Sequence, residues 1–418
     1  GPWLAWAQGQ ARAAPAVRAR VQAHGAELRL TPPGSAPVAL PVLDLKLAGA
    51  PAALAIELSA QVTRQTQRAQ AQLAGQLDLA DPRQGRLVLA RADAQASDER
   101  AQQAARASLA PGNPLALAWQ RAANGLAVRV QQPFALAVQP LARSARLWPE
   151  GRDGRVAIDT LEVNADAVRT TGRVAALPLA WLIGLAGRES QPPAQAPALG
   201  GDLELGTQWD LFWPLTDGGV PKAELSVTRE RGDLLLPVSA GDGTGSAARL
   251  AAGLRESSVR LRVDGTELHA QARWASERAG DATAELRSTL SRQPGGGWTW
   301  GAQAPLSGNL RARVPDIAVW AGLAPPGWRV RGALDGAATL AGTRAAPRLD
   351  GQVEASGLAL RSLADGIEFV NGSLRARLDG ERVLIERLAL EGAGGAAGGG
   401  QLAGTGTVSL ADGEPRMD

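Results

Sequence analysis

Apolar and polar residues alternate along most of the chain, which is the pattern of half-buried β-strands. The apolar positions of these runs include Leu43/Leu45/Leu47, Leu54/Ile56/Leu58, Leu115/Leu117/Trp119, Leu126/Val128/Val130, Val156/Ile158, Leu161/Val163, Val259/Leu261/Val263, Leu268/Ala270/Ala272/Trp274, Trp298/Trp300 and Leu310/Ala312/Val314. Gly or Asp-Gly follows many runs, as at Asp264-Gly265, Asp335-Gly336 and Asp350-Gly351, so successive strands are expected to be antiparallel neighbours. The pattern predicts an all-β fold of roughly twenty strands, each of about six to nine residues, in a long antiparallel sheet.

Residues 366–390, GIEFVNGSLRARLDGERVLIERLAL, allow a register to be predicted. Asn371-Gly372 and Asp379-Gly380 favour type I′ turns, because these residue types tolerate positive φ. The resulting register pairs Phe369 with Leu374, Ile367 with Ala376, Ala376 with Val383, and Leu374 with Ile385. All six of these residues would share one apolar face. The apolar parity changes after Glu386-Arg387, which predicts a β-bulge there.

Two short apolar segments interrupt the alternation, LPLAWLIGLAG at residues 177–187 and VPDIAVWAGLAP at residues 314–325. Each has a proline near its first turn and a later Gly or Pro that ends it, so short helices are predicted near residues 178–186 and 315–323. Their recurrence divides one continuous, elongated β-fold over residues 1–418 into repeat-like units at about residues 20–177, 178–314 and 315–418.

An apolar face of this extent needs a cover. Roughly twenty strands with about three inward apolar residues each would expose about 60 side chains, at a cost on the order of 90 kcal/mol. Two short helices are too few to cover them, and the core of a two-sheet sandwich needs bulky residues. The chain has three Phe, no Tyr and much Ala. These features favour a sheet curled into an open groove with an apolar interior, which acyl chains would suit.

Composition argues against several other classes of function. Lys+Arg 44 and Asp+Glu 41 are interspersed, so the electrostatic footprint of a nucleic-acid-binding protein is absent. The chain has no Cys, and its two histidines, His24 and His269, lack the spacing of a metal site or a catalytic triad. A G-x-G-x-x-A match at residues 243–248 reads better as a loop than as a dinucleotide site. We therefore expect no enzyme activity, no cofactor, no metal and no catalytic residue.

The ends of the chain suggest a piece of a longer protein. It begins Gly1-Pro2, and its single methionine is Met417. The longest apolar run, at residues 175–187, is too short to span a bilayer and contains a proline. Any membrane anchor is expected to precede this segment.

The segment from Trp328 onward resembles the TamB family of the AsmA-like superfamily. The matching features are Gly332 and Leu334, the L-x-G-T of residues 340–343, the A-P-x-L-x-G of residues 346–351, the G-I-E-F-x-N-G-x-L of residues 366–374, and a G-T-G at residues 404–406. The resemblance is specific over the last hundred or so residues and weaker upstream.

This resemblance implies a taco-like β-groove in a protein of the Gram-negative periplasm that is anchored in the inner membrane. The family is implicated in moving phospholipid to the outer membrane, and the TamB branch partners an outer-membrane barrel called TamA. It would place this segment between a missing N-terminal anchor and a missing C-terminal domain.

These expectations define a candidate site and its alternatives. Residues expected to line a lipid groove are Leu115, Leu117, Trp119, Val128, Val130, Val156, Ile158, Leu161, Val163, Val259, Leu261, Val263, Leu268, Trp274, Leu349, Val353, Ile367, Phe369, Leu374, Ala376, Val383 and Ile385. Residues expected to cap or gate it from the two helices are Leu179, Leu182, Leu185, Ile317, Trp320 and Leu323. The preferred function is a periplasmic phospholipid-transfer conduit. The alternatives are a scaffold for outer-membrane protein assembly with a TamA-like barrel and, more remotely, a surface adhesin.

Overall fold

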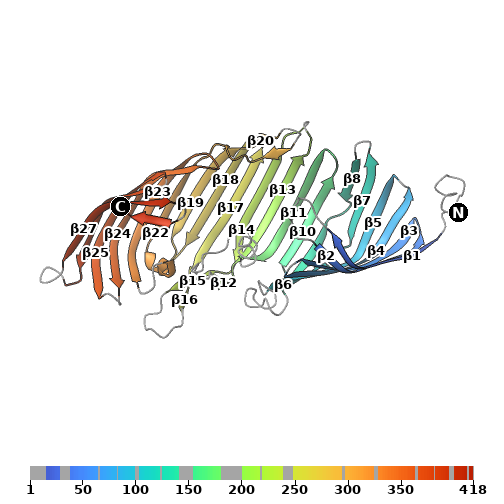
Figure 1. Cartoon of the computed structure of the whole chain (residues 1–418), viewed down its shortest axis with the longest axis horizontal. Helices are drawn as coiled ribbons and strands as arrows, with labels where there is room; N and C mark the ends of the chain where they lie inside the picture. Colours follow the sequence, from blue (N-terminus) through green and yellow to red (C-terminus); the bar gives the residue numbers. More distant parts are fainter. Residues whose placement is uncertain are drawn as a thin grey trace. The chain divides into compact units, whose positions relative to one another are not determined.

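The computed structural model describes residues 16–28, 38–64, 66–81, 83–98, 103–122, 125–140, 154–179, 200–216, 219–238, 248–293, 297–323, 328–362, 366–380, 382–394, 400–411 and 414–417. This part of the chain is nearly all β, and its strands form a long antiparallel sheet (Figure 1). The predicted fold class is confirmed at this level. The strands are longer than predicted, reaching 16 residues in β24 (Pro347–Ser362).

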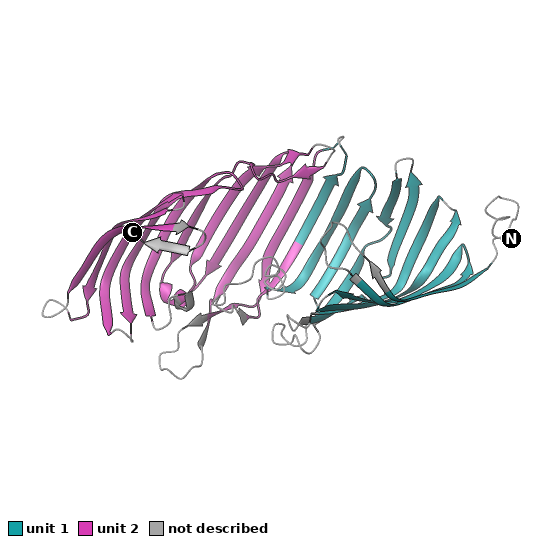
Figure 2. Cartoon of the chain, in the orientation of Figure 1, with its two compact units in different colours: residues 1–184, 208–219 teal, residues 185–207, 220–418 magenta. Residues whose placement is uncertain are grey.

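The chain divides into two compact units, each of which is described by itself (Figure 2). Unit 1 comprises residues 1–184 and 208–219, and unit 2 comprises residues 185–207 and 220–418. The strands of unit 1 are β1 (Val17–Leu28), β2 (Val38–Ala50), β3 (Ala53–Arg64), β4 (Gln67–Asp81), β5 (Gln84–Asp98), β6 (Gln103–Leu109), β7 (Leu115–Ala122), β8 (Gly125–Val130), β9 (Phe134–Pro140), β10 (Gly154–Val163) and β11 (Ala167–Pro178). The residues of β13 (Glu204–Pro214) are divided between the two units.

The elements of unit 2 are β12 (Gly200–Gly201), β14 (Lys222–Arg231), β15 (Leu234–Val238), β16 (Ala248–Ala251), β17 (Leu254–Asp264), β18 (Glu267–Ser276), β19 (Asp281–Thr289), β20 (Ser291–Arg292), β21 (Trp298–Thr299), β22 (Ser307–Val314), η2 (Ile317–Leu323), β23 (Trp328–Gly342), β24, β25 (Ile367–Gly380), β26 (Arg382–Gly392), β27 (Gln401–Ala411) and β28 (Glu414–Met417). From β14 through β17, β18, β19 and β22 to β28, each strand pairs antiparallel with the next. Two small sheets stand apart, β12–β15–β16 and the hairpin β20–β21.

In unit 1, β1 to β5 form a meander in which each strand pairs with the next. Beyond β5, two positions in the sheet are each occupied by two collinear strands. The first half of β5 pairs with β7 and its second half with β6. Strand β8 pairs with β7, and β9 pairs with β6. Strands β8 and β9 then both pair with β10. Strand β11 continues the sheet beyond β10.

A line of irregularities crosses unit 1 at these interruptions. Ala90 has no partner in β4, and Asp159 has none in β11, which marks a bulge at each position. Between them, Asn113 N donates to Ala110 O, and Gln131 N donates to Ala116 O. A bulge shifts the parity of the strand. It therefore keeps both halves of β10, Val156/Ile158 and Leu161/Val163, on the same face of the sheet.

The register predicted for residues 366–390 is partly wrong. Asn371-Gly372 does not form a hairpin turn but lies within β25, where Asn371 has a φ of 53° and the register with β26 shifts. At the next turn Asp379 pairs with Arg382, so Ala376 faces Ile385 and Leu374 faces Leu388, two and three residues beyond the predicted partners. The bulge predicted at Glu386-Arg387 is confirmed.

Asp-Gly is also a poor marker of turns in the longest strands. Asp264 does end β17, as predicted, and pairs with Glu267 across the turn. Asp335-Gly336 and Asp350-Gly351 instead lie inside β23 and β24. At Gly351 a Cβ would lie 2.2 Å from Ala337 O, so this glycine permits a close backbone approach rather than a turn.

The expectation of a few short apolar helices is not confirmed. In the second predicted segment, Ile317 to Leu323 form a 3₁₀ helix, η2, and Asp316 Oδ1 accepts a hydrogen bond from Ala318 N at its start. In the first segment, Leu177 and Pro178 belong to β11, and Leu179 directly follows this strand. Leu182 and Leu185 lie outside the described residues.

Candidate functional site

One face of the sheet in unit 2 is apolar from strand to strand. The longest row of directly opposed residues runs through Val227, Val259, Ala272, Ala284, Leu310, Ala338, Gly351, Leu378, Val383 and Val408. The next row on the same face runs through Trp274, Ala282, Ala312, Gly336, Val353, Ala376, Ile385 and Gly406. Because strands lie about 4.8 Å apart, the first row is roughly 43 Å long.

Parts of this apolar face are open to solvent. Val259 is 47% exposed and Leu310 is 40% exposed, although each lies near the middle of its strand. Toward the ends of the same strands the apolar side chains are buried, as at Leu254 and Val263 of β17. Burial of one such side chain contributes about 1.5–3 kcal/mol. An apolar ligand that covered the exposed side chains would be stabilised by burial of the same kind of apolar surface.

One end of the strands is covered by the β20–β21 hairpin. Trp300 Nε1 donates to Ser288 Oγ over 2.8 Å. Ser288 is buried and opposes Leu268, which is buried as well. The indole of Trp300 therefore lies where the apolar face ends.

Figure 1 shows β15 and β16 at the opposite end of the unit 2 strands from β20. There Trp320 of η2 donates from Nε1 to Ala279 O over 3.3 Å. Ile317 packs against a buried cluster of Ala355, Leu358 and Leu390, together with Leu360, Phe369, Leu374 and Leu388. Two residues of the predicted helix thus lie at an edge of the apolar face.

Asp233 ties β15 to the start of β17. Its carboxylate accepts hydrogen bonds from the backbone N–H groups of Leu234 (2.8 Å), Gly253 (2.8 Å) and Leu254 (3.0 Å). Nearby, Ser276 Oγ donates to Ala252 O and accepts from Ala279 N. These bonds satisfy backbone groups where regular pairing stops.

Unit 1 carries an apolar face of the same kind. One row of opposed residues runs through Val17, Gly49, Leu54, Leu77, Leu87, Leu117 and Val130. Another runs through Val21, Leu45, Leu58, Leu73 and Ala92. Val21 is 51% exposed, so this face is also open in part.

In both units the other face of the sheet is charged and solvated. Its ion pairs join neighbouring strands, and they include Arg20–Asp44, Lys46–Glu57, Arg173–Asp159, Arg262–Glu224, Arg273–Glu256, Arg313–Asp335 and Arg375–Glu354. The hydrogen bonds from Arg20 lower the pKa of the Asp44 carboxyl and raise the pKa of the guanidinium. Exposed pairs of this kind contribute little to stability.

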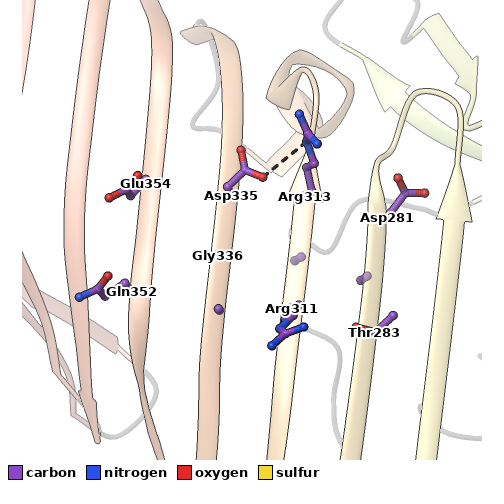
Figure 3. Close-up of a pocket in the computed structure, with 11 residues that line it drawn as sticks. Asp281, Thr283, Arg311, Arg313, Asp335, Gly336, Gln352 and Glu354 are labelled. Atoms are coloured by element: carbon purple, nitrogen blue, oxygen red, sulfur yellow. Dashed lines mark ion pairs between the residues drawn. The ribbon is translucent and has the colours of Figure 1, made fainter.

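A hollow of about 430 Å³ lies over β19, β22, β23 and β24 (Figure 3). Its polar side chains include Arg313 and Asp335, whose closest atoms, Nε and Oδ1, are 3.5 Å apart. Both are exposed, and Arg311, Asp281 and Glu354 complete a mixed set of charges. All five of these charged residues are exposed, as is typical of the polar face of the sheet.

Another ion pair in unit 2 has a buried carboxylate and a partly exposed arginine. The two carboxylate oxygens of Glu204 accept hydrogen bonds from Arg231 Nε (2.5 Å) and an Arg231 terminal nitrogen (2.7 Å). The Glu204 side chain is only 3% exposed. Such a bidentate pair fixes the position of two strands, and its geometry is that of a structural contact.

The described part of the chain contains no group of three or more His, Asp or Glu residues arranged to hold a metal ion. His269 lies 3.3 Å from Glu267 and opposes Arg262, so it belongs to the polar face as predicted. In the same described ranges no helix has the length and apolar character needed to cross a bilayer.

The residues predicted to line a groove fall on the two apolar faces. In unit 1 they are Leu115, Leu117 and Trp119 on β7, Val128 and Val130 on β8, and Val156, Ile158, Leu161 and Val163 on β10. In unit 2 they are Val259, Leu261 and Val263 on β17, Leu268 and Trp274 on β18, Leu349 and Val353 on β24, Ile367, Phe369, Leu374 and Ala376 on β25, and Val383 and Ile385 on β26. Leu323 lies in η2, and its side chain is outside the described residues.

Trp209 escaped the sequence analysis. It donates from Nε1 to Thr170 Oγ1 over 3.2 Å, and its ring lies across Gly172. The alternation of Trp298 and Trp300 did predict a strand, and Trp298 lies in β21 with Trp300 directly after it. Neither tryptophan was predicted to line the groove.

Comparison with known proteins gives no further constraint. No family model, no curated protein and no solved structure matches the chain.

Proposed function

We propose that the chain is a non-enzymatic lipid-binding protein, and that the apolar faces of its sheets take up acyl chains. The observation that carries this proposal is the row from Val227 to Val408 in unit 2, which is apolar in every strand that it crosses. Val259 and Leu310, two members of this row that lie near the middle of their strands, are exposed. A chain of methylene groups needs no hydrogen-bond partners, and the backbone groups below it already pair within the sheet.

In this proposal the apolar face is the interior of an open groove, and phospholipid moves along it from strand to strand. Headgroups stay at the ends of the strands or in water, because burying a charged group without a partner is costly. The resemblance of residues 328–406 to the TamB family supports a place in the periplasm. It also supports phospholipid passage between the inner and outer membranes, and a TamA-like barrel as partner.

The proposal is tested by charging the apolar row. The double variant Val259→Glu/Leu310→Glu places two carboxylates on the exposed part of the face, where they would need to be desolvated by an acyl chain. The matched control, Ser258→Glu/Gln271→Glu, adds the same charge to the polar face of the same sheet. Binding of a fluorescent phospholipid and mass spectrometry of co-purified lipid are the measurements.

The apolar-face variant is expected to lose lipid binding by at least tenfold, while the control retains it. Circular dichroism confirms that both variants keep their β-structure. Equal binding by the two variants would contradict a role for the apolar face. Client polypeptides crosslinked to strand edges, with no lipid on the face, would favour the assembly scaffold instead.

A further inference from the structure

Two arginines stack on two tryptophans at the end of the unit 2 strands where β20 lies. The guanidinium carbon of Arg292 is 5.0 Å from the ring centroid of Trp298, and that of Arg344 is 5.4 Å from the ring centroid of Trp300. Trp298 and Trp300 are two residues apart in an extended segment, which places them on one side of it about 7 Å apart. The two cation–π pairs therefore form one composite surface.

This surface adjoins the apolar face. Trp300 is held by its hydrogen bond to Ser288, whose strand neighbour Leu268 is buried. Arg344 is held by the segment at residues 301–304, because its backbone N–H donates to Ala304 O over 3.0 Å and its Nε donates to Gly301 O over 3.3 Å. The positions of both groups are thus fixed by contacts with the rest of unit 2.

The charge on Arg344 is not neutralised as it is in the strand arginines. Arg313 and Arg375 of the polar face each contact a carboxylate, of Asp335 and Glu354 respectively. Arg344 contacts the Trp300 ring and the Gly301 carbonyl oxygen, and no carboxylate among the residues that the structure describes. A stacked guanidinium keeps its N–H edge free to bind a planar or tetrahedral anion.

Trp298 adds an unused donor. Its Nε1 atom is buried and has no hydrogen-bond acceptor within the described ranges. A buried donor without an acceptor costs about 1–3 kcal/mol. A ligand oxygen would remove this cost once the atoms that cover Nε1 had moved aside.

We propose that Arg292, Arg344 and the Trp298–Trp300 segment form a binding site for the phosphate of a phospholipid headgroup. The inference rests on the proposed function, since it places the phosphate at the end of the strands while the acyl chains lie on the apolar face. Tryptophan suits this boundary because its ring is apolar and its N–H is polar. The guanidinium groups supply charge-assisted hydrogen bonds to the phosphate oxygens.

The test compares two lipids that differ only in the headgroup. Phosphatidylglycerol and diacylglycerol with the same acyl chains are titrated into the wild-type protein, Arg292→Gln/Arg344→Gln, and the control Arg311→Gln/Arg313→Gln. The control removes the same charge from exposed positions on the polar face. Loss of two charge-assisted hydrogen bonds is expected to weaken phosphatidylglycerol binding at least tenfold in the first variant alone. Diacylglycerol binding is expected to stay unchanged in all three proteins.

The other outcomes distinguish a failure of the headgroup site from a failure of the proposed function. Unchanged phosphatidylglycerol affinity, or an equal loss for both lipids, would overturn the headgroup site while leaving the acyl-binding face intact. If the wild-type protein bound neither lipid, the proposed function itself would fail. If inorganic phosphate at equal concentration displaced phosphatidylglycerol, the arginines would be a site for free phosphate, and the proposed headgroup site would be overturned. If phosphate at this concentration displaced no phosphatidylglycerol, the result would support the headgroup site.

Discussion

Single glycines control how closely the strands approach one another. A Cβ at Gly85 would lie 2.0 Å from Trp119 Cζ2, and one at Gly172 would lie 2.4 Å from Trp209 Cζ2. In both cases an indole ring covers a backbone that has no side chain of its own. These two tryptophans therefore act first as packing groups of unit 1, even where they also border the apolar face.

Gly372 of β25 provides a test at this scale. A Cβ there would lie 2.3 Å from Leu390 Cδ2 and 2.7 Å from Leu358 Cβ, both members of a buried cluster. Gly372→Ala is therefore expected to lower the free energy of unfolding by about 1–3 kcal/mol, which is typical of overpacking. Urea unfolding followed by tryptophan fluorescence measures the change.

Gly404 of β27 is the matched control, because a Cβ added there would meet no atom within 4 Å among the described residues. Gly404→Ala is expected to change the free energy of unfolding by no more than about 0.5 kcal/mol. A Gly372→Ala protein as stable as Gly404→Ala would show that the cluster around Leu358 and Leu390 can rearrange without cost.

At the scale of elements, hydrophobic alternation predicted the strands well and their ends poorly. The runs at Leu117 and Val259 are strands, because a period of two places every second side chain on one face. Asn371-Gly372 favours positive φ equally in a type I′ turn and in a strand irregularity, so local chemistry alone could not separate the two. The covers at the strand ends depend on distant contacts such as Trp320 with Ala279, which no local pattern records.

The register between β25 and β26 can be measured with paired cysteines, since the chain has none of its own. Ala376 and Ile385 are directly opposed, so Ala376→Cys/Ile385→Cys is expected to form a disulfide on mild oxidation. Thiol titration and a mobility shift after proteolysis detect it. Ala376→Cys/Val383→Cys, the pair expected from the sequence alone, should remain reduced. The reverse result would restore the two-residue turn at Asp379-Gly380.

At the scale of the whole molecule, the two units share one design, in which one sheet face is apolar and the other is charged. Strands with many apolar residues still have one hydrated face, because charged side chains such as Arg262 and Glu224 are exposed to water on that face. The apolar face is the part of the candidate site that sequence could predict. The arginine–tryptophan surface was not predictable, because Arg344 and Trp300 meet only after β22 and β23 have paired.

If acyl chains bind the folded protein and not the unfolded chain, they should raise the melting temperature of the protein. A ligand at a hundred times its Kd stabilises the folded state by about 2.7 kcal/mol. A lysophospholipid below its micelle concentration is expected to raise the melting temperature, whereas glycerophosphocholine, which lacks the acyl chain, should not. Differential scanning calorimetry measures both. An equal shift with the two compounds would point to the headgroup rather than to the apolar face.

In unit 2, each strand of the main sheet from β17 onward pairs with the preceding main-sheet strand. Apart from the β14–β17 and β19–β22 pairings, these contacts close short connections, so the entropy lost at each such pairing step is small. A chain that folds as it is synthesised could therefore add its strands one at a time to a growing edge. Each completed strand would then serve as the template for the next, and the apolar face would lengthen in step with synthesis.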